Sequence, residues 1–309
     1  MPDHPLDRRT LLKALGAAGL TAALGPAPAA AQAAPLLTRR IPSTGEELPL
    51  VGLGSWGVFN VGSDPAGRDG ATAVLRAFFG AGGRLVDCSP MYGSSQEVIG
   101  HALAALGMPP RLFSADKVWV SPGARGPEQI EASRRHWRVP RFDLLQVHNL
   151  LAWEAHLPAL FAMKQAGRLR YVGITTSHGR RHEDIERLMR AHTLDFIQVT
   201  YNIEDREVEA RILPLAAERG IGVIVNRPFQ RADLLRRFAG KPLPTWAGEL
   251  DCAGWPEFLL KFIVSHPAVT CAIPATSNPA HALEDLRAAR GRLPDATQRR
   301  RMVDDVATL

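Results

Sequence analysis

Short apolar runs alternate with amphipathic stretches along most of this 309-residue chain. Eight runs have the length and composition of buried strands, and each precedes a stretch with helical periodicity. The candidate strands are residues 51–54, 84–88, 112–117, 143–148, 171–175, 195–200, 222–226 and 270–274. Strands that are apolar on both faces belong to parallel sheets covered by helices. We therefore expect an α/β fold, and the chain length suits a single closed (β/α)8 TIM barrel.

The amphipathic stretches complete this pattern. They lie near residues 71–81, 94–106, 127–137, 155–166, 182–191, 207–219, 255–265 and 279–289. Ahead of the first strand, residues 38–50 have the pattern of a β-hairpin with its turn near Gly45. The segment between Gly240 and Trp255 is rich in Pro and Trp and is interpreted as an elaborated loop. A doubly wound open sheet is the alternative architecture.

Charge and cysteine usage restrict the classes of function. The formal net charge of +6 comes from Lys and Arg residues scattered along the chain. The basic run 299–301 fits a solvated helix face better than a nucleic-acid patch. Cys88, Cys252 and Cys271 have neither CxxC spacing nor a metal-ligand pattern. We expect no nucleic-acid partner and no metal site.

Residues 1–33 differ from the rest of the chain and resemble a twin-arginine export signal. Arg8 and Arg9 precede the apolar run ALGAAGLTAALG, and a small-residue A-Q-A site ends at Ala33. The run is shorter than the roughly 20 helical residues that span a bilayer. We expect a cleaved signal peptide followed by one barrel domain, residues 34–309, in the periplasm or outside the cell. The partner is then the twin-arginine translocation machinery, and no membrane span remains after cleavage. An N-terminal amphipathic helix and an uncleaved anchor are the alternatives.

Four polar side chains lie where consecutive candidate strands end. Asp87 and Tyr92 fall at and after the end of the second strand, Lys117 ends the third, and His148 ends the fourth. Because the carboxyl ends of barrel strands meet at one end of the barrel, we expect these four residues to share one site.

This residue set suits proton delivery to a carbonyl oxygen. A positive charge about 4 Å from a phenolate contributes roughly 4 kcal/mol at an effective dielectric constant of about 20, as an upper guide. Lys117 is therefore predicted to lower the pKa of Tyr92, and Asp87 to keep Lys117 protonated. His148 is expected to hydrogen-bond the substrate oxygen. None of the four carries a hydride, which implies a nicotinamide cofactor. The alternative interpretations are a structural ion pair, a packed aromatic ring and a satisfied core histidine.

These residues lie in motifs that resemble the aldo-keto reductase family over residues 37–290. GLGSW at 52–56 resembles the GLGTW of the family, and the sequence from Asp87 to Gly93 resembles its D-x-x-x-x-Y-G signature. Lys117 and His148 match the lysine and histidine that follow. The resemblance implies that Tyr92 is the general acid, that Lys117 and Asp87 tune it, and that His148 orients the substrate.

The same resemblance implies where the cofactor and substrate bind. The expected cofactor-binding residues are Thr175, Thr176, Gln198, Asn226, Arg227, Pro228, Thr276, Ser277 and His281. Trp56 and Trp119 are expected in the substrate pocket. Asn226 stands where many relatives have an aromatic residue, and Ala275 and His281 stand where basic residues are typical. NADP(H) is the expected cofactor and NAD(H) is the alternative.

The sequence thus predicts an NAD(P)H-dependent oxidoreductase that reduces a small aldehyde or ketone to an alcohol. The alternative is an exported, reductase-like barrel that acts as a non-catalytic binding or redox-sensing module. A metal-dependent sugar-type barrel enzyme is disfavoured, because Asp, Glu and His do not cluster at the other strand ends.

Overall fold

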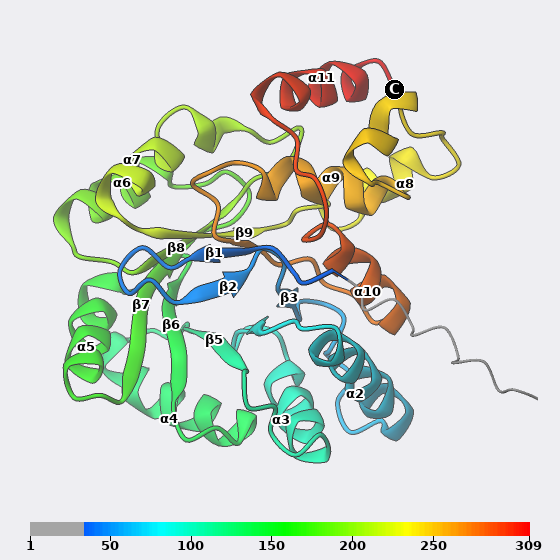
Figure 1. Ribbon diagram of the computed structural model, residues 1–309. Coiled ribbons are helices and arrows are strands. Elements are labelled where there is room, and N and C mark those ends of the chain that lie inside the picture. Colours follow the sequence, from blue (N-terminus) through cyan, green and yellow to red (C-terminus); the bar gives the residue numbers. More distant parts are fainter. Residues whose placement is uncertain (1–33) are drawn as a thin grey trace, which may run out of the picture. The chain divides into compact units, whose positions relative to one another are not determined.

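The computed structural model describes residues 34–309, in which eight parallel strands form a barrel (Figure 1). They are β3 (Leu53–Gly54), β4 (Leu85–Asp87), β5 (Phe113–Val118), β6 (Phe142–His148), β7 (Leu169–Thr175), β8 (Phe196–Thr200), β9 (Gly222–Asn226) and β10 (Cys271–Ala272). Hydrogen bonds join them in chain order. Parallel bridges from Val51 to Ala272 and from Gly54 to Ala275 join the first strand to the last. The (β/α)8 barrel expected from the sequence is confirmed.

Glycines in the first strand allow this closure. A Cβ atom on Gly52 would lie 3.0 Å from the carbonyl oxygen of Leu85, and one on Gly54 would lie 3.0 Å from that of Ile273. With Gly57 these glycines have the G-x-G-x-x-G spacing, which forms a phosphate-binding turn in dinucleotide-binding open sheets. Here Gly52 and Gly54 instead let neighbouring strands approach closely.

Helices surround the barrel, as Figure 1 shows. Those that follow the eight strands are α2 (Pro65–Gly80), α3 (Ser95–Ala105), α4 (Gly126–Trp137), α5 (Trp153–Gln165), α6 (His182–Ala191), α7 (Ile212–Arg219), α9 (Trp255–Val264) and α10 (Pro279–Arg287). The others are α8 (Asp233–Phe238), α11 (Ala296–Ala307) and the 3-10 helices η1 (Gly123–Arg125), η2 (Glu207–Glu209) and η3 (Thr245–Leu250). Helix α8 was not predicted from the sequence, and η3 lies in the segment interpreted as an elaborated loop.

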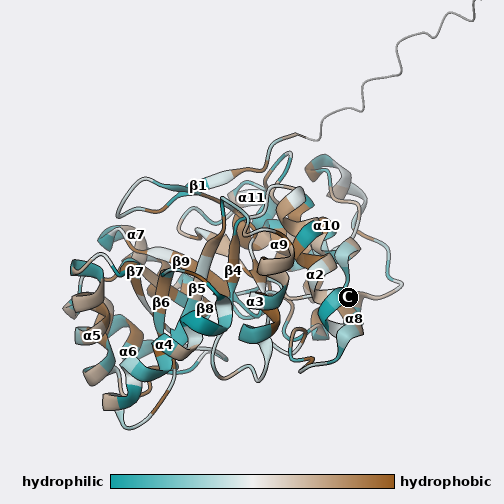
Figure 2. Ribbon diagram, turned by 90° about the horizontal axis from the view of Figure 1, so that it is seen from below, coloured by the Kyte–Doolittle hydropathy of each residue, from teal (hydrophilic) through white to brown (hydrophobic). Residues whose placement is uncertain are grey.

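The hydrophobic core has two layers. Inside the barrel, buried side chains such as Phe113, Tyr171 and Phe196 pack against one another, with Phe113 and Tyr171 stacked at 5.7 Å between ring centroids. A larger layer lies between the strands and the helices. In Figure 2 the central strands are mostly coloured hydrophobic, whereas α4 and α6 are largely hydrophilic. This arrangement follows from strands that are apolar on both faces and helices that are apolar on one.

The N-terminal hairpin, β1 (Thr38–Arg40) and β2 (Glu47–Pro49), covers the amino ends of the barrel strands. Glu46 accepts hydrogen bonds from Arg84 at 2.9 Å and from the Tyr171 hydroxyl at 2.8 Å, and it also pairs with Arg170. These residues lie at the start of β4 and β7. The hairpin therefore closes one end of the barrel, and the functional loops lie at the other.

The segment after β9 packs against the barrel. Trp246 and Trp255 are both more than nine-tenths buried, and their indole N–H groups donate to Asp305 at 2.7 Å and to the carbonyl of Lys241 at 2.9 Å. Lys261 on α9 is fully buried, and its ammonium donates to three backbone carbonyls, which fixes this segment. Trp246 is thus packed away from the cavity described below, whereas Trp255 also lines that cavity.

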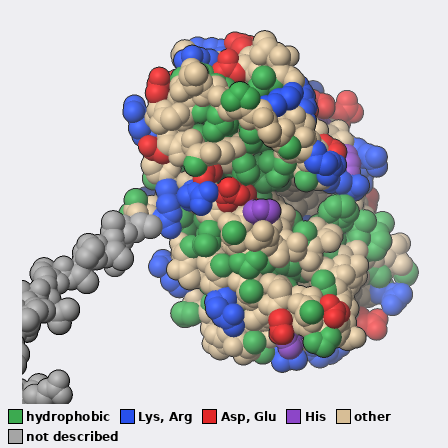
Figure 3. Space-filling model, turned by 90° about the vertical axis from the view of Figure 1, so that its right-hand side faces the viewer, with side chains coloured by type: hydrophobic (Ala, Val, Ile, Leu, Met, Phe, Trp, Pro, Cys, Tyr) green, Lys and Arg blue, Asp and Glu red, His purple; other side chains and the backbone are tan. Residues whose placement is uncertain are grey.

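Two further observations concern the surface and the chain termini. Charged side chains of both signs are spread over the face shown in Figure 3, with hydrophobic side chains between them. Within residues 34–309, no helix has both the length and the apolar character that a membrane span requires. The expected export signal, residues 1–33, lies outside the described residues.

Candidate active site

A cavity of about 780 Å³ opens at the carboxyl end of the barrel. Asp87 ends β4, His148 ends β6 and Thr175 ends β7, so all three reach the same cavity. Tyr92, in the loop after β4, also lines it. The volume lies within the range of roughly 300–1,000 Å³ that is typical of small-molecule sites.

Asp87 and Lys117 form a buried ion pair beneath this cavity. The ammonium of Lys117 is fully buried and lies 2.5 Å from Asp87 Oδ1 and 2.8 Å from the carbonyl oxygen of Cys88. The second oxygen of Asp87 accepts a hydrogen bond from Gln198 at 3.0 Å. Burial alone would lower the pKa of Lys117, but the interactions with Asp87, Tyr92 and Asp116 together outweigh it and raise the pKa above 10.5. Lys117 therefore remains charged.

Tyr92 lies above Lys117, with the ammonium 5.3 Å from the centroid of the phenol ring. Burial raises the pKa of Tyr92 to about 12, although the charge of Lys117 opposes the rise. Lys117 lowers the pKa of Tyr92, as predicted from the sequence, but burial outweighs this effect, and the net shift is upward instead of downward. In the barrel mouth, the phenolate loses more free energy of hydration than it gains from its interaction with the ammonium of Lys117. The phenol consequently holds its proton at neutral pH.

His148 completes the group of four. Its ring meets that of Tyr92 edge to face, with 5.8 Å between centroids and 86° between the planes. Burial and the charge of Lys117 lower the pKa of His148 to about 3, so the imidazole is neutral at neutral pH. Its Nδ1 atom lies 2.7 Å from the hydroxyl of Ser89. Ser89 was not predicted as a site residue, because a serine inside a loop motif carries no signal of its own.

Side chains at the ends of β7, β8 and β9 form a connected polar row. The side-chain oxygen of Gln198 accepts from Thr175 at 3.3 Å and from Asn226 at 3.4 Å. The oxygen of Asn226 accepts from the Thr200 hydroxyl at 2.7 Å, and its nitrogen donates to the Thr176 carbonyl at 2.9 Å. Thr175, Gln198 and Asn226 line the cavity. Thr176 is not among the lining residues, and its backbone carbonyl contacts Asn226, so a contact of its hydroxyl with the cofactor stays a prediction.

Basic side chains lie where the loops meet at the cavity mouth. Arg227 and Pro228 line the cavity as expected. Arg227 lies 2.6 Å from Nε2 of His178, which joins the loops after β9 and β7. The guanidinium of Arg231 stacks over the ring of Trp56 at 4.3 Å from its centroid. Neither His178 nor Arg231 was predicted as a site residue, because both contacts join loops that are distant in sequence.

Three of the expected cofactor-binding residues lie at the start of α10. Thr276, Ser277 and His281 all line the same cavity. The hydroxyl of Thr276 accepts from the backbone N–H of Asn278 at 3.0 Å, and the Asn278 side chain caps the helix. Asp285 lines the same region, and burial raises the pKa of its carboxyl well above 3.8. The side of the cavity formed by the start of α10 therefore presents hydroxyl and imidazole groups together with a buried carboxyl group.

Large hydrophobic side chains stand exposed around the site. Trp56 is 44 % exposed, Met91 43 % and Trp119 37 %. Trp56 and Met91 line the cavity, whereas Trp119 is not among the lining residues. Its ring centroid lies 6.5 Å from that of His148. Trp119 therefore lies beside His148, and its contact with a substrate stays a prediction, whereas Met91 was not predicted from the sequence.

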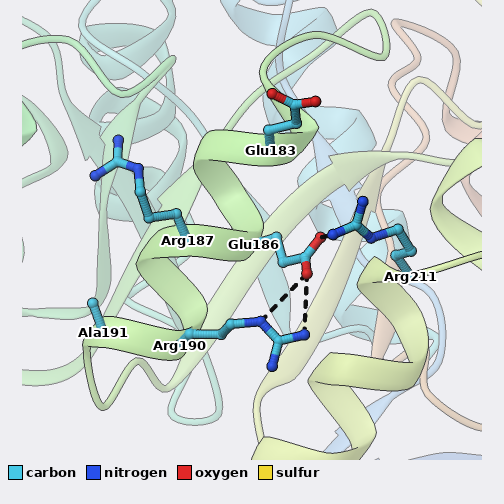
Figure 4. A pocket seen from close by; sticks show the side chains of 6 residues that line it. All are labelled: Glu183, Glu186, Arg187, Arg190, Ala191 and Arg211. Carbon is cyan, nitrogen blue, oxygen red and sulfur yellow. Dashed lines mark hydrogen bonds and ion pairs between the residues drawn. The ribbon is translucent and has the colours of Figure 1, made fainter.

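A second hollow lies on the outer surface by α6 and Arg211 and has a different character (Figure 4). Glu186 on α6 pairs with Arg190 at 3.0 Å and with Arg211 at 2.6 Å. Because these charges neutralise one another, the hollow is interpreted as a surface ion-pair cluster. Among residues 34–309, no three His, Cys, Asp or Glu side chains are grouped so as to hold a metal ion.

Comparison with known proteins identifies related sequences. A model of the Aldo/keto reductase family matches residues 50–300. Aldo-keto reductase YhdN of Bacillus subtilis (strain 168) is 28 % identical over 202 residues, which cover 60 % of each chain. Aldo-keto reductase str7 of Strobilurus tenacellus is 27 % identical over 226 residues, which cover 66 % of this chain and 64 % of that one. The chain thus matches less than two thirds of the length of these relatives.

Solved structures share the fold. An aldo-keto reductase from Klebsiella pneumoniae in complex with NADPH has a TM-score of 0.71 at 21 % identity, covering 88 % of this chain and 95 % of that one. Aldo-keto reductase AKR11C1 from Bacillus halodurans, in its holo form, has a TM-score of 0.69 at 21 % identity, with 88 % and 96 % covered. At this level of identity, the likeness establishes the barrel architecture.

Proposed function

This chain belongs to the aldo/keto reductase family, and from that premise we propose that it reduces an aldehyde or ketone to an alcohol with NAD(P)H. The observation that carries the proposal is the grouping of Asp87, Lys117, Tyr92 and His148 at one cavity. A buried cation beside a protonated phenol and a neutral imidazole provides the proton donor that reduction of a carbonyl group requires.

The cavity also suits a nicotinamide dinucleotide. Thr175, Gln198 and Asn226 offer hydroxyl and amide groups for the carboxamide, next to the proposed acid. Arg227 and Pro228 lie beside them, and Thr276, Ser277 and His281 lie at the start of α10, where backbone N–H groups favour phosphate. We propose NADP(H) as the cofactor, with NAD(H) as the alternative. Bound there, the reduced nicotinamide supplies the hydride that the protein side chains lack.

Tyr92 is proposed as the general acid. With a pKa of about 12, its phenol keeps the proton until a substrate oxygen gains negative charge. The phenolate that remains is stabilised by Lys117, whose own charge is maintained by Asp87. Proton transfer from Tyr92 to the oxygen, together with hydride arrival at carbon, balances the reduction to an alcohol. Solvent then returns the proton to Tyr92.

His148 and the hydrophobic side chains are proposed to hold the substrate. The neutral imidazole donates a hydrogen bond to the carbonyl oxygen without competing with Tyr92 as an acid, because its pKa is about 3. Trp56 and Met91 line the cavity and offer apolar contact to the substrate. A small carbonyl compound with an apolar substituent fits these surroundings.

We also propose that residues 1–33 are a twin-arginine signal and that the mature protein functions outside the cytoplasm. The order of Arg8-Arg9, an apolar run and an A-x-A site ending at Ala33 supports this.

Nucleotide binding and turnover test the proposed activity together. Purified protein is titrated with NADPH and NADH while protein fluorescence is followed, and oxidation of the bound nucleotide is then measured with a panel of aldehydes and ketones. We expect saturable quenching and substrate-dependent oxidation. Quenching without turnover would contradict the enzymatic role, and the absence of both would contradict the cofactor as well.

A further inference from the structure

Ser89 lies between Asp87 and Tyr92 in the loop after β4, and it contacts His148 at the end of β6. It follows Asp87 by two residues, is fully buried, and places its hydroxyl oxygen 2.7 Å from Nδ1 of His148. The same oxygen accepts a hydrogen bond from the backbone N–H of Met91 at 3.2 Å. The loop after β4 therefore holds Ser89 against the end of β6.

The hydrogen atoms around this contact have one consistent arrangement. The Ser89 hydroxyl has one hydrogen, and one of its lone pairs is occupied by the N–H of Met91. Among residues 34–309, His148 Nδ1 is the only acceptor that this hydrogen can reach. If Nδ1 carried a proton and donated it to Ser89, the hydroxyl hydrogen would be left without a partner in a fully buried position. The hydroxyl therefore donates to Nδ1.

This assignment determines the other side of the imidazole. A neutral imidazole carries one proton, so an accepting Nδ1 leaves that proton on Nε2. Within the described residues, Nε2 of His148 has no hydrogen-bond partner, and His148 lines the cavity. The Nε2–H group is thus available to a ligand.

We propose that Ser89 is a positioning residue that fixes His148 in its Nε2–H tautomer, so that the imidazole donates to the substrate oxygen. The inference rests on the proposed function for the identity of that acceptor. In the opposite tautomer, Nε2 would present a lone pair to the carbonyl oxygen, and the two lone pairs would repel. Tyr92 would then be the remaining donor at that oxygen.

Nuclear magnetic resonance of the histidine nitrogens tests the tautomer directly. The ring nitrogens of His148 are assigned in 15N-labelled protein near neutral pH, in the wild type, Ser89→Ala and Ser114→Ala. Ser114 is the matched control, because it is also buried, donates to Asp143 at 3.0 Å and accepts a backbone N–H at 3.0 Å. We expect a protonated Nε2 in the wild type and in Ser114→Ala. In Ser89→Ala, we expect a measurable population with a protonated Nδ1.

Two results would overturn the inference. One is a wild-type His148 with its proton on Nδ1. The other is a Ser89→Ala protein whose tautomer population equals that of the wild type. If Ser89→Ala does not fold, the wild-type spectrum and that of Ser89→Thr, which retains a hydroxyl, decide the question.

Steady-state kinetics provide a second readout. For Ser89→Ala we expect a loss of about tenfold in kcat/KM for the carbonyl substrate, with an unchanged Kd for NADPH and recovery in Ser89→Thr. An unchanged kcat/KM would contradict the role of the tautomer in substrate binding. If no variant reduces a carbonyl while the spectra follow expectation, the proposed function fails and the tautomer assignment stands.

Discussion

Asp87 and Lys117 each stabilise the charge of the other, because both charges are buried inside the barrel. Replacing Lys117 by Met leaves the Asp87 carboxylate buried without a counter-charge. We expect Lys117→Met to lower the free energy of unfolding by about 3–5 kcal/mol at neutral pH. The double variant Asp87→Asn/Lys117→Met should lose less, since no buried charge remains. Urea denaturation measures both, and a double variant no more stable than Lys117→Met would contradict this account.

Asp116 is a second buried carboxyl group, adjacent to Lys117 in β5. It accepts hydrogen bonds from the Lys117 backbone N–H and from Gln96, each at 2.7 Å. Burial raises its pKa from 3.8 to about 7. The folded protein therefore keeps a proton on Asp116 that the unfolded chain loses near pH 4, and stability falls as pH rises from about 4 to about 7.

Asp116→Asn removes that pH dependence. The difference in pKa corresponds to at most about 4 kcal/mol, so the variant should become more stable than the wild type as pH rises through this range. The Gln96 amide can rotate to accept from the new side chain, which preserves the contact. Free energies of unfolding measured from pH 4 to pH 8 check the prediction. Parallel curves for the two proteins would show that Asp116 ionises freely in the folded state.

At the scale of elements, the loop between β9 and α8 brings two guanidinium groups to the cavity. Arg227 and Arg231 both line it, and Arg231 also contacts Trp56 from the loop after β3. Gln230, Arg231 and Ala232 all have positive φ angles between 49° and 70°, which costs conformational energy in residues other than glycine. Such a turn suits a loop whose role is to present its side chains to a ligand.

We propose that Arg231 forms a charge-assisted contact with a cofactor phosphate, and we expect Arg231→Met to weaken NADPH binding about tenfold. The dependence of Kd on salt concentration should also become less steep, since one screened ionic contact is removed. Arg236→Met is the control, because Arg236 pairs with Asp233 on α8 and is not among the residues lining the cavity. Fluorescence titrations at several salt concentrations measure both effects. Equal affinity and equal salt dependence in the two variants would contradict a role for Arg231 in phosphate binding.

Some features of these elements could be predicted from the sequence, and others could not. The ends of β4, β5 and β6 follow from short apolar runs, and these runs alone bring Asp87, Lys117 and His148 to one end of the barrel. The helix α8 is only six residues long, too short for a periodic signal. Ser89 and Arg231 act through contacts across loops, which sequence spacing does not encode. The pKa of Tyr92 was misjudged because its burial depends on the assembled barrel.

At the scale of the whole molecule, residues Pro35–Leu309 form one compact unit. In a host with the twin-arginine machinery, we expect the exported protein to begin at Ala34, as measured by intact mass. Replacing Arg8 and Arg9 together by Lys should retain the protein in the cytoplasm. An exported protein that keeps residues 1–33 would contradict cleavage, and export of the double-lysine variant at the wild-type level would contradict the route.

The central claim is that Tyr92 protonates the carbonyl oxygen of a substrate reduced by NAD(P)H. Its most direct test is a single-turnover experiment in which protein preloaded with NADPH is mixed rapidly with a test aldehyde. The wild type should consume one equivalent of bound nucleotide. Tyr92→Phe should bind NADPH equally well and react at least about 100-fold more slowly. A Tyr92→Phe protein that reacts at the wild-type rate would contradict the claim.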